Sequence, residues 1–148
     1  MRIMHRATNG FTLTELVTVI GIATILSAFA ISRINVASFD TEGFANRAAA
    51  MVRYAQKIAI SQRRTVFVVI SSNTITLRYT TSGGTPLHEP PGTNAFSYSA
   101  PSGVAIADAT FSFNALGKPS AGTTISVTGD GTKTITVVAE TGYVQYGP

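Results

Sequence analysis

The chain of 148 residues contains no cysteine, so disulfide bonds, thiol chemistry and thiolate metal sites are excluded. It has two histidines, His5 and His88, and no Gly-x-Ser-x-Gly sequence with triad partners. Asp108 and Asp130 are single carboxylates beside Ala or Gly, whereas Ca²⁺ takes about six to eight oxygen ligands. No glycine-rich phosphate loop precedes a helix. We therefore expect no enzyme, no cofactor and no metal site.

Charge is scarce as well, since only 12% of the residues are charged while Ser, Thr and Gly are abundant. This composition is typical of a β-rich domain outside the cytoplasm. Eleven Lys and Arg residues face seven Asp and Glu residues, for a net charge of +4. Two of the basic residues, Arg2 and Arg6, lie in the first ten positions, so the rest of the chain carries only +2. The length suits one compact domain with an appendage.

One long apolar run follows the basic start. No charged residue occurs from Leu16 to Ser32. The stretch from Phe11 to Ile31 would form about 31 Å of helix, close to the thickness of a bilayer core. Glu15 lies inside this stretch, although a charge at membrane depth costs roughly 2.5–3.5 kcal/mol. The run therefore predicts a transmembrane segment in which Glu15 has a function and a partner.

Two simpler interpretations compete with that one. A secretory signal peptide would have a shorter apolar region and a small-x-small cleavage site, which Ser27-Ala28-Phe29-Ala30 resembles. A plain membrane anchor would explain the length and the basic flank. Neither explains Glu15, but an uncut N-terminus or a cut near Ala30 would favour one of them.

The sequence Gly10-Phe11-Thr12-Leu13-Thr14-Glu15-Leu16 resembles the leader junction of type IV prepilins and type II secretion pseudopilins. The resemblance implies cleavage between Gly10 and Phe11, N-methylation of Phe11, and assembly through Glu15. Glu15 of one subunit would pair with the Phe11 amine of a neighbour, which offsets the cost of burying either charge alone. Many family members have a kinking Pro in the apolar run; this chain has none between Phe11 and Arg64.

The same resemblance implies partners and a location. The partners would be a prepilin peptidase and methyltransferase, an inner-membrane assembly platform, other pilins or pseudopilins, and membrane lipid before assembly. The protein would cross the bacterial inner membrane once, with a periplasmic head, and then enter a periplasmic or extracellular pilus or pseudopilus. Secretion, motility and DNA-uptake machines share this junction, and the sequence does not separate them.

Helical periodicity resumes after a polar interruption at Asp40 to Gly43, where we expect a bend or loosening. An apolar face then recurs at helical spacing: Phe44, Ala48, Met51, Val52, Ala55, Ile58 and Ala59. Arg53, Lys57 and Arg64 fall on the opposite face. The pattern predicts one helix from Phe11 to about Gln62, whose second half packs a small-residue stripe on a sheet.

From Thr65 the period changes to that of strands. The expected strands are 65–70, 74–80, 95–99, 104–107, 109–113, 123–128, 133–138 and 143–146, with a hairpin turn at Gly129-Asp130-Gly131-Thr132. Loops rich in Gly and Pro are expected at 82–92 and 114–122. The predicted fold class is α+β, a long N-terminal helix with a transmembrane half and an amphipathic half, packed on an antiparallel β-sheet head.

The head also resembles that of the GspH/FimT group of minor pilins. The resemblance rests on Phe111-x-Phe113-x(3)-Gly117, the strand-turn-strand of 123–138, Thr141-Gly142-Tyr143-Val144, and the helix end at 52–64. It implies the pilin fold. The segments are then a cleaved leader at 1–10, a transmembrane and assembly helix at 11–32, an amphipathic helix at 33–62 and the β head at 63–148.

Two functions follow from this reading. The first is a structural minor pilin or pseudopilin at the tip or at initiation of a fibre. The alternative is a DNA-binding minor pilin for natural transformation, because some FimT-type pilins bind DNA. Its candidate contacts are Arg53, Lys57, Arg63 and Arg64. The tail from Gly142 has no basic residue, and Tyr143 stands where DNA-binding relatives place arginine. DNA uptake is therefore the less favoured function.

Overall fold

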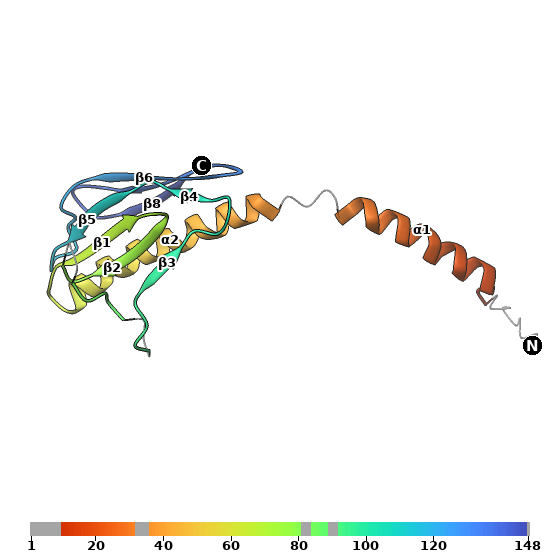
Figure 1. The fold of residues 1–148 in the computed structure, drawn as a ribbon, viewed down its shortest axis with the longest axis horizontal. Helices are drawn as coiled ribbons and strands as arrows, with labels where there is room; N and C mark the ends of the chain where they lie inside the picture. Colours follow the sequence, from red (N-terminus) through yellow and green to blue (C-terminus); the bar gives the residue numbers. More distant parts are fainter. Residues whose placement is uncertain (1–9, 32–35, 81–83, 89–91, 148) are drawn as a thin grey trace, which may run out of the picture. The chain divides into compact units, whose positions relative to one another are not determined.

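The computed structural model describes residues 10–31, 36–80, 84–88 and 92–147. The chain divides into two compact units, Met1–Asn35 and Val36–Pro148, and each is considered by itself. In the first unit, helix α1 covers Leu13–Ile31 (Figure 1). Among the described residues, no helix combines the length and the apolar character needed to cross a membrane. The transmembrane assignment of 11–32 stays a prediction. Residues 1–9 of the predicted leader at 1–10, and residue 32, lie outside the described residues.

Helix α2 covers Val36–Ser61 and runs without a break through Asp40 to Gly43. The predicted bend at those positions is therefore wrong. Tertiary contacts outweigh local polarity here: Thr41 is buried, and its Oγ1 accepts a hydrogen bond from the Asp130 amide at 3.2 Å. The predicted continuity of one helix through 32–35 lies outside the described residues.

The apolar face predicted for the second helix is confirmed. Phe44, Ala48, Met51, Val52, Ala55 and Ala59 are buried, and Ile58 packs against them partly buried. The helix ends in a Schellman motif, in which the Arg64 amide bonds the Ala59 carbonyl and the Arg63 amide bonds the Ile60 carbonyl. Arg63 adopts a left-handed conformation at φ 50°, a position that glycine usually fills.

The head has two four-stranded antiparallel sheets rather than the single sheet expected. The first has the order β3 (Ser97–Ser99), β2 (Thr74–Arg78), β1 (Val66–Ser71), β5 (Ala109–Phe113). The second has the order β4 (Ala105–Ile106), β6 (Thr123–Gly129), β7 (Gly131–Val137), β8 (Val144–Gly147). All eight strands lie within or beside the segments predicted from the sequence.

The chain changes sheets between β4 and β5, at Ala107 and Asp108. Asn73 helps to hold the two sheets together there, because its Oδ1 accepts a hydrogen bond from the Ile106 amide at 3.2 Å. Asn73 also occupies the β1–β2 turn, where it and Ser72 both have positive φ, as a two-residue hairpin turn requires. Periodicity finds strands but does not say which strands pair, so the sequence did not predict this division.

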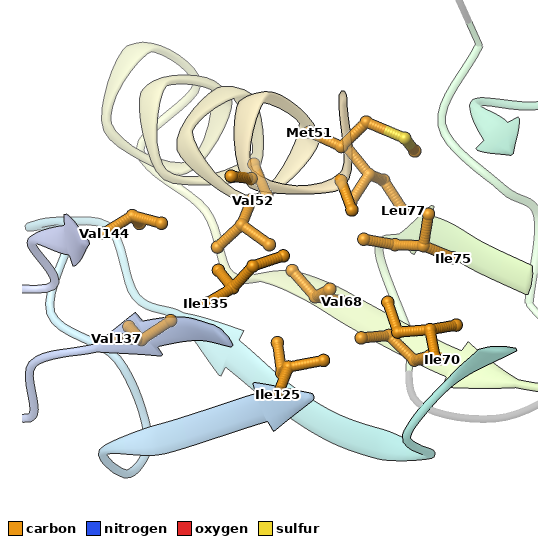
Figure 2. Close-up of a cluster of buried hydrophobic side chains, with 14 of the residues drawn as sticks. Met51, Val52, Val68, Ile70, Ile75, Leu77, Ile125, Ile135, Val137 and Val144 are labelled. Carbon is orange, nitrogen blue, oxygen red and sulfur yellow. The ribbon is translucent and has the colours of Figure 1, made fainter. Parts of the chain in front are cut away.

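The core lies where α2 meets both sheets. Helix α2 contacts β1, β2 and β5 of one sheet and β6, β7 and β8 of the other. Figure 2 shows Val52 of α2 directed toward Val68 on one side and Ile135 on the other. Among the described residues, every member of the hydrophobic core belongs to the second unit, so the head has a core of its own.

The predicted loop at 82–92 contributes one core residue in its described part. Leu87 is buried; its amide donates to the Leu77 carbonyl at 2.8 Å, and its carbonyl accepts from the Phe96 amide. Because Pro residues flank it, this single apolar residue belongs to no periodic pattern from which its burial could be predicted. The loop therefore closes one end of the core beside β2 and β3.

Candidate functional site

The N-terminal end of α1 positions Glu15 in the first helical turn. Thr12 caps the helix: its Oγ1 accepts from the Glu15 amide at 3.3 Å, and its carbonyl accepts from the Leu16 amide at 3.1 Å. Thr12 and Glu15 have the spacing of a capping box, and a carboxylate is favoured beside the positive end of a helix dipole. The side chain of Glu15 is exposed. The helix thus orders a carboxylate at its start and leaves it accessible.

Gly10 and Phe11 lie immediately before this helix. Both are exposed, and Phe11 retains 80% of its accessible surface. A Cβ placed on Gly10 would meet no atom within 4 Å. A side chain added at Gly10 is therefore free of steric conflict among the described residues, so a substitution there tests recognition of the junction rather than folding.

The surface of α1 is apolar on every side. Its exposed large side chains are Leu13, Leu16, Val17, Val19, Ile20, Ile22, Ile25 and Leu26, which together cover the full helical circumference. The hydroxyls in the helix bond to its own backbone: Thr18 reaches the Thr14 and Glu15 carbonyls, and Thr24 and Ser27 reach carbonyls of the preceding turn. Such a helix needs an apolar environment, which residues 10–31 do not themselves supply.

A polar cluster fastens the start of α2 to the second sheet. The Tyr146 hydroxyl donates to Glu42 Oε1 at 2.6 Å, and Lys133 Nζ lies 3.0 Å from Glu42 Oε2. These bonds, that of Tyr146 foremost, hold the pKa of Glu42 below its usual value. Burial and the nearby Glu42 raise the pKa of Tyr146 to about 12. Sequence reasoning missed this cluster, because its members are about 90 to 104 positions apart.

The four basic residues proposed as DNA contacts have different surroundings. Arg53 donates to the Val144 carbonyl at 3.2 Å, and the Arg64 guanidinium lies 3.6 Å from the centre of the Tyr79 ring. Lys57 and Arg63 are exposed, and within the described residues no carboxylate pairs with either. Arg53 and Arg64 therefore also make contacts within the head, although all four residues are exposed.

His88, Asp108 and Asp130 are exposed and lie on different segments of the head. Asp130 forms the apex of the β6–β7 hairpin, between Gly129 and Gly131 of the strand register, as the sequence predicted. Within the described residues, no three carboxylate or imidazole groups gather where a metal ion could be held.

Between α2 and β3 lies an open groove of about 290 Å³ that sequence reasoning did not find. It is lined by Arg47, Ala50, Met51, Tyr54, Phe96, Ser97 and Tyr98. The Arg47 guanidinium lies 4.2 Å from the centre of the Tyr98 ring, and Tyr54 stacks on Phe96 at 4.9 Å. The stacked rings brace β3, the edge strand of its sheet, against α2.

Solved structures of a known protein share this fold. Two crystal structures of the type IV minor pilin FimU of Pseudomonas aeruginosa strain PAO1, in space groups P65 and P21, are similar to the chain. The first is 18% identical with a TM-score of 0.56, over 72% of this chain and 92% of FimU. The second is 17% identical with a TM-score of 0.59, over 75% and 90%. No protein-family model and no curated protein matches the chain.

The likeness to FimU is one of fold. The chain has a pilin-like α+β fold, in which helix packs on antiparallel sheet.

Proposed function

We propose that the chain is a minor pilin or pseudopilin, a structural subunit that enters a type IV pilus or a type II secretion pseudopilus after cleavage of its leader. One observation carries the proposal: a pilin-like head follows a separate apolar helix that presents Glu15 in its first turn. The head has its own core, whereas the large apolar side chains of α1 are exposed in the described part of its unit. Packing among like helices would supply that cover.

Assembly in this proposal exchanges one apolar environment for another. The subunit waits in the inner membrane with residues 11–32 inserted and the head in the periplasm. It then leaves lipid for a bundle of like helices at the tip or at initiation of the fibre. Removal of the leader frees an amine on Phe11, and Glu15 of an adjacent subunit pairs with it inside the bundle. That pair sets the register between neighbours.

The N-terminus of the mature protein tests the proposal. We expect mass spectrometry of the full chain from its own bacterium to find a polypeptide that begins at Phe11 and carries one methyl group. Gly10→Val should leave the leader attached, visible as about ten extra residues. Gly21→Val, at another position where a Cβ meets no atom, is the matched control and should be processed normally. A mature chain that begins near Ala30, or that keeps Met1, would refute the proposal.

DNA binding is the less favoured function. It requires several cations that follow the phosphate backbone. Arg53 and Arg64 already make contacts within the head, and the tail from Gly142 has no basic residue. A gel-shift experiment with short duplex DNA and the full chain at low salt tests this function. Retardation that Arg63→Glu and Arg64→Glu abolish would make DNA binding the favoured function.

A further inference from the structure

The turn between β5 and β6 holds Leu116 out in solvent. Asn114 Oδ1 accepts from the amides of Leu116 and Lys118, each at 3.0 Å, and the Asn114 carbonyl accepts from the Gly117 amide at 2.9 Å. The Asn114 amide in turn donates to the Lys118 carbonyl at 2.9 Å. The turn is therefore rigid, yet the side chain at its tip is 87% exposed. Because the backbone of the turn is already fixed, binding at its tip costs little further ordering of the backbone.

Two further exposed apolar residues, Ile60 and Tyr143, belong to segments that meet at this turn. A Cβ on Gly117 would come 2.7 Å from Ile60 Cδ1, so Ile60 lies against the turn. Gln56 Nε2 donates to the Gly117 carbonyl at 2.9 Å and to the Thr141 carbonyl at 3.3 Å, which brings the Gly142–Tyr143 segment to the same place.

Gly117 and Gly142 both have positive φ and touch, because a Cβ on Gly142 would collide with the Gly117 carbonyl. Ile60, Leu116 and Tyr143 thus surround one glycine junction. We call these three residues the end patch.

The exposed large apolar residues of the described head are concentrated in the end patch. In the described head, Phe39 is the other large apolar side chain that is exposed, and it lies near the opposite end of α2. Scattered exposed apolar residues are ordinary, but three gathered on a rigid support mark an interaction surface.

The charges around the end patch are mainly positive. Lys57 follows Gln56 on α2, Lys118 follows Gly117, and Arg63 bonds the Ile60 carbonyl through its amide. All three side chains are exposed, and in the described part of the chain none pairs with a carboxylate. Glu140, next to Thr141, is the acid on this rim. A partner with carboxylates around an apolar depression would match both features.

We propose that the end patch is a protein-docking surface, and that its partner is a different protein with an apolar pocket rimmed by carboxylates. A second copy of this chain fits less well, because the groove beside β3 carries Arg47 and would meet Lys57 and Lys118 with like charge. Nucleic acid fits less well because phosphates gain nothing from Ile60 and Leu116 at the centre. The proposal concerns the head alone and does not depend on how α1 assembles.

Photo-crosslinking in the full chain, in its own bacterium, tests the proposal. A benzophenone amino acid replaces Tyr143, and Ser102 is the matched control position. Ser102 is exposed and precedes Gly103, whose carbonyl lies near Gly129 and Thr41, at the other end of α2. We expect an adduct from position 143 and none from position 102. The adduct should join an apolar residue that has carboxylates beside it in the identified partner.

Variants then distinguish docking from chance proximity. Leu116→Ser should reduce the adduct at least about tenfold while the melting temperature stays the same, because this side chain is exposed in the folded head. Lys57→Glu with Lys118→Glu should reduce it roughly tenfold, and reversal of the partner's carboxylates to lysine should restore it. An adduct only with a second copy, an adduct only with DNA, or equal adducts from positions 143 and 102 would overturn the proposal.

Discussion

The two helices of this protein differ in how their apolar side chains are distributed and covered. Helix α2 is amphipathic: one face is buried against strands of both sheets, and the other carries Arg53 and Lys57. Helix α1 has large apolar side chains all around and a single charge, Glu15. The head stabilises α2 from within the chain, whereas the large apolar side chains of α1 are exposed in the described part of the first unit. One helix therefore supports folding, and we infer that the other supports assembly.

The two glutamates give the largest test of this contrast. Glu15→Gln should leave the head fully stable but reduce assembled fibre by roughly tenfold or more, because the charge that offsets a buried amine is lost. Glu42→Gln is the control, since Glu42 serves the head alone. Fibre counts by electron microscopy and melting temperatures of both variants separate the two roles. Wild-type fibre numbers in the Glu15→Gln strain would contradict the assignment.

Two phenylalanines of α2 test the buried face. Phe44 is 1% exposed and stacks on Tyr98, so Phe44→Ala should lower the free energy of unfolding by about 3–5 kcal/mol. Phe39 is 70% exposed, and Phe39→Ala should change the free energy of unfolding by no more than about 0.5 kcal/mol. Denaturant titration followed by circular dichroism measures both. Equal losses would mean that α2 does not stabilise the head through one face.

The dependence of stability on pH tests the polar cluster of Glu42, Lys133 and Tyr146 between α2 and the second sheet. Tyr146 and Lys133 lower the pKa of Glu42 in the folded state. The contribution of Glu42 to stability is therefore present above the unfolded-state pKa near 4.5, and it is lost as pH falls through the lower pKa of the folded state. The pKa of Tyr146 is raised to about 12, so its contribution is complete below about pH 10 and is lost as pH rises from there.

Thermal melts from pH 3 to 11 should therefore show an acidic decline that is smaller in Glu42→Gln than in the wild type. The same decline in both proteins would mean that other carboxylates dominate the acid limb.

The smallest effect is expected at the end of α2. Arg63 holds a left-handed conformation that glycine adopts without strain, so Arg63→Gly should raise the free energy of unfolding by roughly 0.5–1 kcal/mol. Arg64→Gly is the contrasting variant, since it removes the contact with Tyr79 and should lower stability. The same denaturant titrations compare them. A loss in Arg63→Gly would mean that the arginine side chain stabilises the helix end.

Local pattern was sufficient for much of this fold. The period of α2 identified its buried face, and alternation with turn residues located the strands and the hairpin at Asp130. The predicted bend at 40–43 failed for a physical reason. The polar run that includes Thr41 and Glu42 interrupts the apolar pattern. The hairpin and Tyr146, about 90 to 104 positions later, supply hydrogen bonds for these two residues.

Of the candidate surfaces, one can be predicted from the sequence and the other cannot. Gly10, Phe11 and Glu15 form a contiguous motif, so sequence alone proposes them, and their roles stay predictions. The end patch joins Ile60, Leu116 and Tyr143 from three separate segments. The only local sign of it is the Asn-x-x-Gly turn, which predicts a turn but does not predict which residue its tip exposes. Such surfaces require the tertiary structure.

The position of α2 between two sheets that share no strand has a mechanical consequence. A pull on the start of α2 loads the head along the helix axis, so its contacts with six strands must shear together rather than open one at a time. Glu42, Arg53 and Gln56 add polar anchors to strands or turns along the same helix. We infer that a head built this way resists tension along α2 cooperatively, a property that would suit the fibre subunit proposed above.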